Sequence, residues 1–381
     1  MSTDYKHMDV SKYDVIVVGA GLSGMVMAER FAAVKNKRVL VIDKRAHIGG
    51  NCYDYIDEET GILVNKYGAH LFHTNDTEVF EYVSRFCKWK RWEHEVLGLV
   101  DGQYCSIPAN ITTVNRICDE QISNSQEMDE WLSKNQIKYD SIHNGEQMAK
   151  SRVGNVLYEK LFKHYTYKQW NRYPEELLPE VLARIPVRNN HDTRYFSDKY
   201  QALPEKGYTH FFNKMAESNP LIDVVLETDY FKLKDSISPG QTTIYTGPID
   251  HYFSQSGFPA LEYRSICFET TRLFNTPFYQ PNSVVNYPGP DVPYTRCVEY
   301  KHFLNQQSDH TVIVKETTTD SGEPYYPVLN QKNTELYQKY LEMASREASN
   351  VHFIGRLASY KYFNMDQAIR NSLDYFNKNF K

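Results

Sequence analysis

The sequence predicts an α/β protein in which two further domains interrupt a nucleotide-binding domain. Three observations predict this arrangement. An apolar, β-branched run at residues 15–18 leads into closely spaced glycines, as a strand followed by a tight turn and a helix would. The C-terminal residues 351–376 return to a strand–turn–helix pattern. Between these ends lie a helical stretch (112–165) and several β-rich runs (195–323), which predict an inserted helical domain and an inserted antiparallel sheet.

The first run carries the most specific motif in the chain. Its glycines fall at GxGxxG spacing, namely Gly19, Gly21 and Gly24. A second apolar run (39–42) ends in an acid, Asp43, nineteen residues after the last glycine. This is the βαβ fingerprint of a dinucleotide site, in which Asp43 would accept hydrogen bonds from ribose hydroxyls. The helix N-terminus around Ser23 would offer N–H groups to the phosphates.

The fingerprint alone leaves FAD and NAD open. The residues after Asp43 favour FAD, because a basic pair that includes Lys44 is followed by Gly49, Gly50 and Asn51. Flavoproteins of the glutathione-reductase type often carry such an element beside the adenosine and the diphosphate. The sequence therefore predicts a Rossmann-type FAD-binding domain.

Composition excludes several classes of protein. A chain of 381 residues predicts two or three domains, and a net charge of −5 argues against a nucleic-acid partner. No apolar run is long enough to cross a membrane, and the polar N-terminus lacks the core of a signal peptide, so a cytoplasmic location is expected. The six cysteines have no metal-ligand spacing, which predicts reduced thiols and no metal. The thirty tyrosines suit recognition of sugar and phosphate.

Each element follows from a local pattern. Residues 95–107 predict a hairpin that turns at Asp101-Gly102. Three prolines within residues 170–188 predict an interrupted, mobile lid. Residues 241–248 and 311–315 predict strands. Near the C-terminus the expected elements are a helix at 333–345, a strand at 351–354 and a helix at 365–376.

These elements predict three domains. The FAD-binding domain comprises residues 1–78, 205–250 and 335–381. The helical domain with its lid comprises residues 112–184. The antiparallel sheet, which we expect to bind substrate, comprises residues 79–111, 185–204 and 251–334.

Several blocks, in order along the chain, resemble the UDP-galactopyranose mutase family. They are Gly49-Gly50-Asn51, 67–74 (YGAHLFHT), 165–170 (YTYKQW), 184–188 (RIPVR), 245–250 (YTGPID), 292–296 (VPYTR), 323–327 (EPYYP) and 355–357 (GRL). The resemblance implies an isomerase that interconverts UDP-galactopyranose and UDP-galactofuranose. It also implies reduced FAD as cofactor, with flavin N5 as the nucleophile on the anomeric carbon and no net redox change. The implied partners are a UDP-sugar, an external reductant such as NAD(P)H, and a second subunit in a homodimer.

The resemblance also assigns the candidate site residues. Arg184 and Arg296 match the pair that binds the diphosphate, and nearby Arg188 is the rival for the first. His73 is expected near N5 and the sugar. The substrate-binding candidates are Phe162, Tyr165, Trp170, Tyr195, Asn286, Tyr325, Tyr362 and Asn364. The cofactor-binding candidates are Gly19, Gly21, Ser23, Gly24, Asp43, Lys44, Gly50, Asn51, His70, Arg264, Gly355, Arg356, Met365 and Asp366.

Two positions depart from the family pattern. Ala69 stands where the family usually has Pro, and Asn364 stands where it has Asp. The second departure leaves a UDP-N-acetylgalactosamine or a 6-deoxy sugar nucleotide open as the substrate. Two other hypotheses share this fold class. They are an amine-oxidase-like flavoprotein, against which the Arg and Tyr set argues, and a binding protein of the guanine-nucleotide dissociation inhibitor type, against which the intact fingerprint argues.

Overall fold

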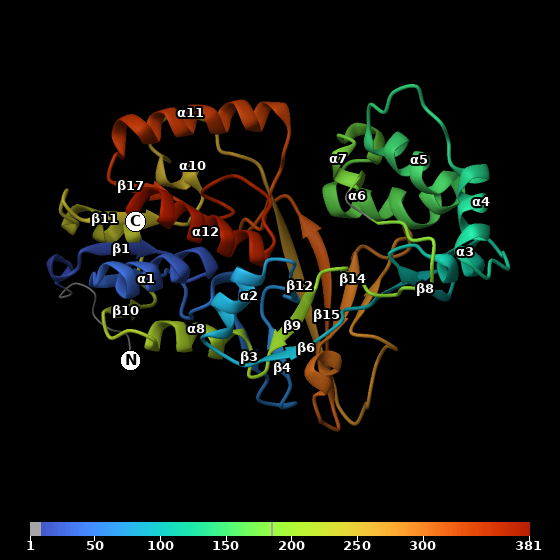
Figure 1. Ribbon diagram of the computed structural model, residues 1–381, viewed down its shortest axis with the longest axis horizontal. Helices are drawn as coiled ribbons and strands as arrows, with labels where there is room; N and C mark the ends of the chain where they lie inside the picture. The colour runs from blue at the N-terminus through green and yellow to red at the C-terminus, as the bar shows by residue number, and fades with distance from the viewer. Residues whose placement is uncertain (1–8, 184–185) are drawn as a thin grey trace.

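The computed structural model describes residues 9–183 and 186–381 (Figure 1). A five-stranded sheet in the order β10-β2-β1-β11-β17 pairs its strands in parallel throughout. Its strands are β1 (Val15–Val18), β2 (Val39–Ile42), β10 (Ile222–Val225), β11 (Thr242–Tyr245) and β17 (Val351–Phe353). They come from three distant stretches of the chain, so the nucleotide-binding domain is discontinuous, as the sequence predicts.

Both faces of this sheet are buried. Val15 and Val17 pack with helices α1 (Leu22–Lys35), α8 (Tyr208–Glu217) and α12 (Met365–Phe380) in one apolar core. Ile16 points to the opposite face, because side chains alternate along a strand, and packs with Tyr230 there. Helices α10 (Ile249–Tyr252) and α11 (Gln331–Glu347) lie in the same part of the molecule as this sheet (Figure 1), and α9 (Tyr230–Leu233) contributes Tyr230 and Leu233 to the core on the face of Ile16. This burial explains why the strands are near-continuous apolar runs.

A seven-stranded sheet stands beside the parallel sheet, in the order β16-β12-β15-β14-β13-β7-β8. Its strands are β7 (Val96–Val100), β8 (Gln103–Ile107), β12 (Tyr263–Leu273), β13 (Val284–Asn286), β14 (Arg296–Glu299), β15 (Thr311–Thr319) and β16 (Tyr326–Pro327). The sheet is antiparallel, as predicted, at every pair but one, since β13 runs parallel to β7. These two strands lie far apart in the chain, and the long connection allows either direction. The hairpin at 95–107 is confirmed, and Asp101 and Gly102 both have positive φ.

The helical unit lies at the far end of the molecule from the parallel sheet (Figure 1). It contains α3 (Ile111–Ile117), α4 (Ser125–Asn135), α5 (Gly145–Leu157), a π-helical turn (Tyr158–Lys163), α6 (His164–Trp170) and α7 (Glu180–Ala183). The predicted helical stretch is therefore confirmed, but it is broken: α5 kinks at Gly154, whose φ is 75°. A core that includes Met128, Trp131 and Leu157 holds the unit together.

Two smaller sheets complete the fold. One has three strands in the order β5-β9-β6, from β5 (Phe72–Thr74), β6 (Trp89–Arg91) and β9 (Tyr200–Pro204); the other pairs β3 (Asp54–Ile56) with β4 (Leu63–Asn65). Helix α2 (Thr77–Ser84) follows β5. The three-stranded sheet takes strands from both sides of the expected boundary at residue 78, and the domain boundaries stay predictions. Within the described residues, no helix is both long and apolar enough to cross a membrane.

Candidate active site

The glycine motif forms a cradle of backbone at the end of β1. A Cβ on Gly24 would lie 1.9 Å from the Gly19 carbonyl oxygen, so only glycine lets α1 begin this close to the strand. Gly21 caps α1 without any side-chain hydrogen bond, which leaves the N–H groups of the first turn available to a ligand. Gly50 closes the cradle from the other side, since a Cβ there would lie 2.9 Å from the Gly21 Cα atom.

The acidic residue after β2 lies against this cradle. The Asp43 carboxylate accepts hydrogen bonds from the Ala20 N–H at 2.8 Å and the Arg45 N–H at 2.9 Å. Arg45 in turn donates to Asn51 Oδ1 at 2.8 Å, which ties the basic pair to the Gly-Gly turn. Lys44 is different: its ammonium lies 3.2 Å from Glu323 on the surface, with 60% of its side chain exposed. Its role toward a cofactor stays a prediction.

The C-terminal strand and helix reach the same place. Gly355, just after β17, lies against Ser23 in the first turn of α1. Met365 and Asp366 begin α12, and the Met365 sulfur is 3.8 Å from the thiol of Cys52. Asp366 Oδ1 is buried and has no hydrogen-bond partner among the described residues. A cradle that excludes side chains, free N–H groups and an unpartnered buried oxygen together fit a dinucleotide cofactor.

A second group of residues is centred on Arg296. Antiparallel pairing puts Asn286, Arg296 and Glu316 directly opposite one another on three neighbouring strands, so their side chains share one face of the sheet. Arg296 Nε lies 2.7 Å from Glu316 Oε2. Burial alone would lower the pKa of Arg296. The nearby Glu316 carboxylate favours the charged form and raises this pKa well above its usual value. Arg296 is therefore permanently charged and forms an ion pair with Glu316.

Aromatic side chains surround this arginine. Tyr165 on α6 lies close to Arg296. Burial raises the pKa of the Tyr165 hydroxyl, and the nearby Arg296 charge lowers it in part. Tyr326 on β16 stacks on Tyr362, with ring centroids 5.6 Å apart. The Arg356 guanidinium lies 5.4 Å and 5.5 Å from the centroids of those two rings. Because Arg356 directly follows Gly355, this stack joins the arginine cluster to the cradle.

The adjacent tyrosines of the 323–327 block face different surroundings. Tyr325 is 6% exposed, and its ring packs near Tyr67 and Phe268. Tyr326 lies beside Arg296. Burial raises the pKa of its hydroxyl above the usual value, and Tyr362 raises it further, whereas Arg296 lowers it in part. Tyr325 is the tyrosine that the sequence predicts for substrate binding, and this role stays a prediction; Tyr326, which was not predicted, is the one beside Arg296. The alternation of side chains along a strand shows that only one of the two can face the site, but not which one.

The histidine block supplies two differently held rings. His73 on β5 stacks on Phe196 at 3.7 Å, and its Nδ1 lies 3.0 Å from Asp198 Oδ2. The carboxylate can only accept, so Nδ1 carries the proton and the carboxylate fixes the orientation of the ring. Neither Asp198 nor Phe196 was predicted, because nothing in the local sequence marks them.

The other histidine, His70, is neutral. Burial, supported by Arg356 and Arg296, lowers its pKa to about 4. Its Nδ1 lies 2.8 Å from the Gly68 carbonyl oxygen, which accepts a hydrogen bond. Nδ1 therefore carries the proton, and Nε2 is left as an acceptor beside two arginines. His94, which sequence analysis also missed, is 4% exposed, and burial together with Arg296 and His73 lowers its pKa to about 3.

The remaining substrate candidates lie around this cluster. Tyr195 packs against Phe196, with centroids 5.0 Å apart, and contributes to the surroundings of Tyr165. Phe162 belongs to the π-helical turn and is 8% exposed within the helical core. Trp170 ends α6, and the next residue takes a left-handed φ of 54°.

Asn364 and Arg264 have local structural partners. Asn364 is the N-cap of α12, and its backbone N–H donates to Gln367 Oε1 at 2.9 Å. Arg264 is 4% exposed and is tied to α6 and the end of β15: it donates to the Gln169 carbonyl at 3.1 Å and pairs with Asp320. Sequence analysis placed Arg264 at the cofactor. That role stays a prediction.

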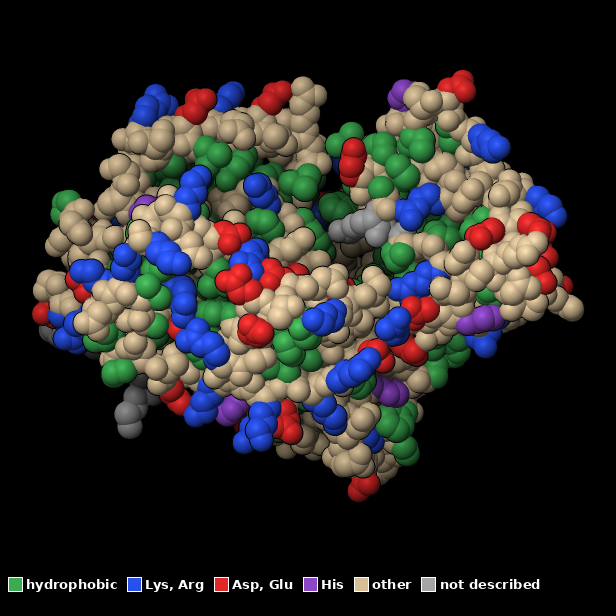
Figure 2. All heavy atoms as spheres, in the orientation of Figure 1, with side chains coloured by type: hydrophobic (Ala, Val, Ile, Leu, Met, Phe, Trp, Pro, Cys, Tyr) green, Lys and Arg blue, Asp and Glu red, His purple; other side chains and the backbone are tan. Residues whose placement is uncertain are grey.

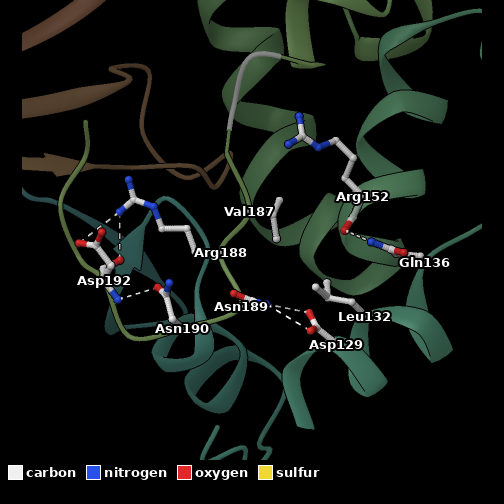
Figure 3. A pocket seen from close by; sticks show the side chains of 9 residues that line it. All are labelled: Asp129, Leu132, Gln136, Arg152, Val187, Arg188, Asn189, Asn190 and Asp192. Atoms are coloured by element: carbon white, nitrogen blue, oxygen red, sulfur yellow. Dashed lines mark hydrogen bonds and ion pairs between the residues drawn. The ribbon is translucent and has the colours of Figure 1, made fainter. Parts of the chain in front are cut away.

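Arg184 and Arg188 are the two candidate lid arginines. Arg184 lies outside the described residues. The Arg188 guanidinium donates to the carbonyls of Asp192 and Arg194, so it is held by its own loop. It also lines a surface pocket of about 510 Å³ between this loop and α4 (Figure 3). None of the predicted substrate residues lines that pocket.

The arginine and tyrosine cluster comes from elements that meet in the middle of the molecule. Figure 2 shows the surface hollowed between the part that contains α11 and α12 and the helical unit that contains α6. Among the described residues, no group of three or more His, Cys, Asp or Glu side chains is placed to hold a metal ion. The side chains that lie around Arg296 are those of tyrosine, histidine and a second arginine.

Comparison with known proteins decides the family. The family model described as UDP-galactopyranose mutase matches residues 160–362, and a model for an NAD(P)-binding Rossmann-like domain matches residues 17–86. A probable UDP-galactopyranose mutase of Klebsiella pneumoniae is 35% identical over 94% of this chain and 93% of its own. The chain belongs to the UDP-galactopyranose mutase family.

Two further similarities refine this result. A dTDP-fucopyranose mutase of Escherichia coli is 34% identical over 94% of this chain and 96% of its own. A crystal structure of a reduced UDP-galactopyranose mutase superposes with a TM-score of 0.74 at 14% identity, covering 96% of this chain and 93% of that one. The fold and the mutase family are therefore confirmed, in place of the amine-oxidase-like and dissociation-inhibitor hypotheses. The two sequence relatives differ in the sugar nucleotide that their names give.

Proposed function

We propose that this chain is a flavin-dependent mutase that interconverts UDP-galactopyranose and UDP-galactofuranose. The observation that carries the proposal is the position of Arg296, a charged guanidinium opposite Asn286 and among tyrosines, next to a glycine cradle built for a dinucleotide. A nucleotide sugar needs both parts, because its diphosphate requires cations and its sugar requires hydroxyl and amide partners.

The residues of the chain would divide the work as follows. Arg296, with Arg184 from the lid segment, would bind the diphosphate and stabilise the negative charge that grows on it when the anomeric C–O bond breaks. Tyr326 and Tyr362 would donate hydrogen bonds to the same oxygens. Tyr165 would support the uracil from α6. We expect this division because the side chains come from separate elements and lie near one another around Arg296.

The histidines would act on the sugar side. His73 would present Nε2 to the sugar hydroxyls while Asp198 holds its Nδ1. His70 would stay neutral and accept a hydrogen bond at Nε2. Reduced FAD, when bound in the cradle, would supply the nucleophilic nitrogen that the protein side chains lack. An external reductant such as NAD(P)H would be needed to prepare it.

A second sugar nucleotide is kept as a candidate on two observations. The dTDP-fucopyranose mutase is almost as similar to this chain as the UDP-galactopyranose mutase is. Asn364 also stands where the family usually has Asp, at the N-cap of α12. A 6-deoxy sugar lacks one hydroxyl, and a site that hydrogen-bonds that hydroxyl would discriminate strongly against it.

Competition between substrates tests the proposal. The flavin of the purified protein is reduced with dithionite, and the protein is incubated with equal concentrations of UDP-galactopyranose, UDP-N-acetylgalactosamine and dTDP-fucopyranose. Chromatography then separates the pyranose and furanose forms of each. We expect UDP-galactopyranose to be converted fastest. A preference for either competitor would overturn the substrate while leaving the reaction type, and no conversion of any would overturn both.

A further inference from the structure

Helix α6 carries a lysine whose ammonium group is enclosed by backbone. Lys168 lies between Tyr165 and Trp170, and its Nζ donates to four carbonyl oxygens of the loop that joins β13 to β14. Nζ lies 2.8 Å from the Gly289 oxygen, 3.0 Å from that of Tyr294 and 3.2 Å from that of Val292; the fourth partner is Tyr287. An ammonium has three N–H donors, so all of them are engaged here.

The loop that encloses Lys168 has a composition that requires such a donor. Residues 287–295 read YPGPDVPYT, and the three prolines have no N–H. The loop cannot pair its own carbonyls in a regular ladder, so a donor from another element must satisfy those that point inward. One backbone bond closes its base, from the Tyr287 N–H to the Thr295 carbonyl at 2.9 Å.

This loop ends at two of the candidate substrate residues. Asn286 is the last residue of β13 and Arg296 is the first of β14, and the two pair directly across the strands. A change in the width of the loop would therefore move both side chains. Tyr165, one turn before Lys168, approaches the same arginine from α6.

The backbone around Lys168 is fastened as well. The Lys168 carbonyl accepts a hydrogen bond from the Thr318 hydroxyl on β15, and the next carbonyl, that of Gln169, accepts from Arg264. Asn171 Nδ2 lies 3.1 Å from Asp320 Oδ2 just beyond. These bonds fix the end of α6 to the sheet, so the lysine side chain is held at its base and at its tip.

We propose that Lys168 is a positioning residue that holds the loop at 287–295 against α6. In this way Lys168 sets the distance between the Asn286–Arg296 pair and the aromatic side chains of the helical unit. The expected loss of kcat/KM rests on the proposed mutase function, whereas the hydrogen bonds between Lys168 and the loop do not depend on it. Lys168 acts through Arg296 and Asn286, and nothing places it against substrate or cofactor.

A double-mutant cycle tests the role. Lys168→Met keeps an unbranched side chain as far as Cε and removes the ammonium group with its donors. It should lower kcat/KM for UDP-galactofuranose about 30- to 100-fold, the order of loss that a misplacement of about 1 Å can cause. The flavin content should stay normal. In an Arg296→Ala background the same change should cost less than about tenfold, because Arg296, one of the two residues through which Lys168 acts, is gone and only Asn286 is left. Equal losses in both backgrounds would overturn the inference.

Lys163→Met is the matched control. Lys163 lies just before α6 and its ammonium is 2.9 Å from Glu159 at the surface, so its loss should leave kcat/KM within about twofold. If Lys168→Met fails to fold, Lys168→Arg replaces it. A planar guanidinium cannot occupy a cage sized for an ammonium, so a loss of about tenfold is expected, and this loss should be smaller in the Arg296→Ala background. An arginine variant with the wild-type kcat/KM would contradict the proposal.

Amide hydrogen exchange separates this inference from the proposed function. The amides of residues 286–296 should exchange faster in Lys168→Met than in the wild type, and should be unchanged in Lys163→Met. Unchanged exchange in Lys168→Met would overturn the inference whatever the turnover. A wild-type protein that converts no sugar nucleotide would overturn the proposed function, while faster exchange in that protein would still support the role of Lys168 in holding the loop.

Discussion

The cradle at the end of β1 and the cluster around Arg296 are built in opposite ways. The cradle is made of backbone and glycine from residues 19–24 and 43–51, together with the turn at Gly355. The cluster is made of long side chains that come from β14, β15, β16, α6 and the loop before α12. The comparison shows that a backbone site is specified by local spacing, whereas a side-chain site is specified by how distant elements pack.

The largest expected effect is on the cradle. Gly24→Ala places a methyl group 1.9 Å from the Gly19 carbonyl oxygen, so α1 must move away from β1. Flavin content should fall to almost nothing, and mutase activity should fall with it. The absorbance of the purified variant near 450 nm measures the flavin.

Gly240→Ala is the matched control for that change. Gly240 belongs to the same predicted domain, has no positive φ, and has open space where the methyl group would lie. Its flavin content and activity should equal those of the wild type. Normal flavin content in Gly24→Ala would mean that the cradle does not bind the cofactor.

The next effect separates chemistry from cofactor binding. Arg296→Ala should lose roughly 10²–10³ in kcat, or about 2.7–4 kcal/mol of transition-state stabilisation, with flavin content unchanged. Arg184→Ala should lose a similar amount. Steady-state kinetics with UDP-galactofuranose measure both losses.

Arg188→Ala is the comparison for these arginines. Its guanidinium already binds the carbonyls of Asp192 and Arg194, so its loss should change kcat far less. If Arg188 proved essential and Arg184 dispensable, the lid arginine would be the wrong one. Loss of flavin in Arg296→Ala would show that the two regions are not separable.

The sequence predicted the cradle more fully than the cluster for a physical reason. GxGxxG spacing, a following acid and a Gly-Gly turn are local, and the positions of Gly24, Asp43 and Gly50 around one point follow from them. The parallel sheet, the hairpin and the C-terminal strand and helix were likewise predicted from local periodicity. The direction of β13 beside β7 was not, because strand direction depends on a partner almost two hundred residues away.

Only some of the residues around Arg296 could be predicted from the sequence. Resemblance supplied Arg296, Tyr165 and Tyr362, which the structure brings near one another. It did not supply Glu316, Asp198 or His94, because each acts on a neighbour from another strand or loop. It supplied Tyr325 and not Tyr326, and which of the two faces the site depends on strand register, which is set by pairing with β12.

That choice gives the third prediction. Tyr326→Phe removes a hydroxyl beside Arg296 and should lower kcat/KM about tenfold, the cost of one hydrogen bond to a charged group. Tyr325→Phe removes a hydroxyl from a side chain that is 6% exposed and should change kcat/KM by less than about threefold. Kinetics of the two variants side by side measure the difference. The reverse order would show that Tyr325 is the substrate residue, as sequence analysis predicted.

The smallest effect is expected at Asn364. Asp and Asn are equally good N-caps, so Asn364→Asp should leave α12 intact. The added charge should change kcat/KM for UDP-galactofuranose by less than about tenfold, or 1.36 kcal/mol. Competition with dTDP-fucopyranose measures specificity at the same time. A reversal of sugar preference in this single variant would make Asn364 the residue that selects the sugar.

The most direct test of the account is the dependence of turnover on the redox state of bound flavin. The wild-type protein is poised with dithionite at a series of reduced fractions, and conversion of UDP-galactofuranose to UDP-galactopyranose is followed by chromatography. We predict a rate proportional to the reduced fraction, with no activity in fully oxidised or flavin-free protein. Equal rates in oxidised and reduced protein would contradict a cradle and a cluster that act together on one substrate.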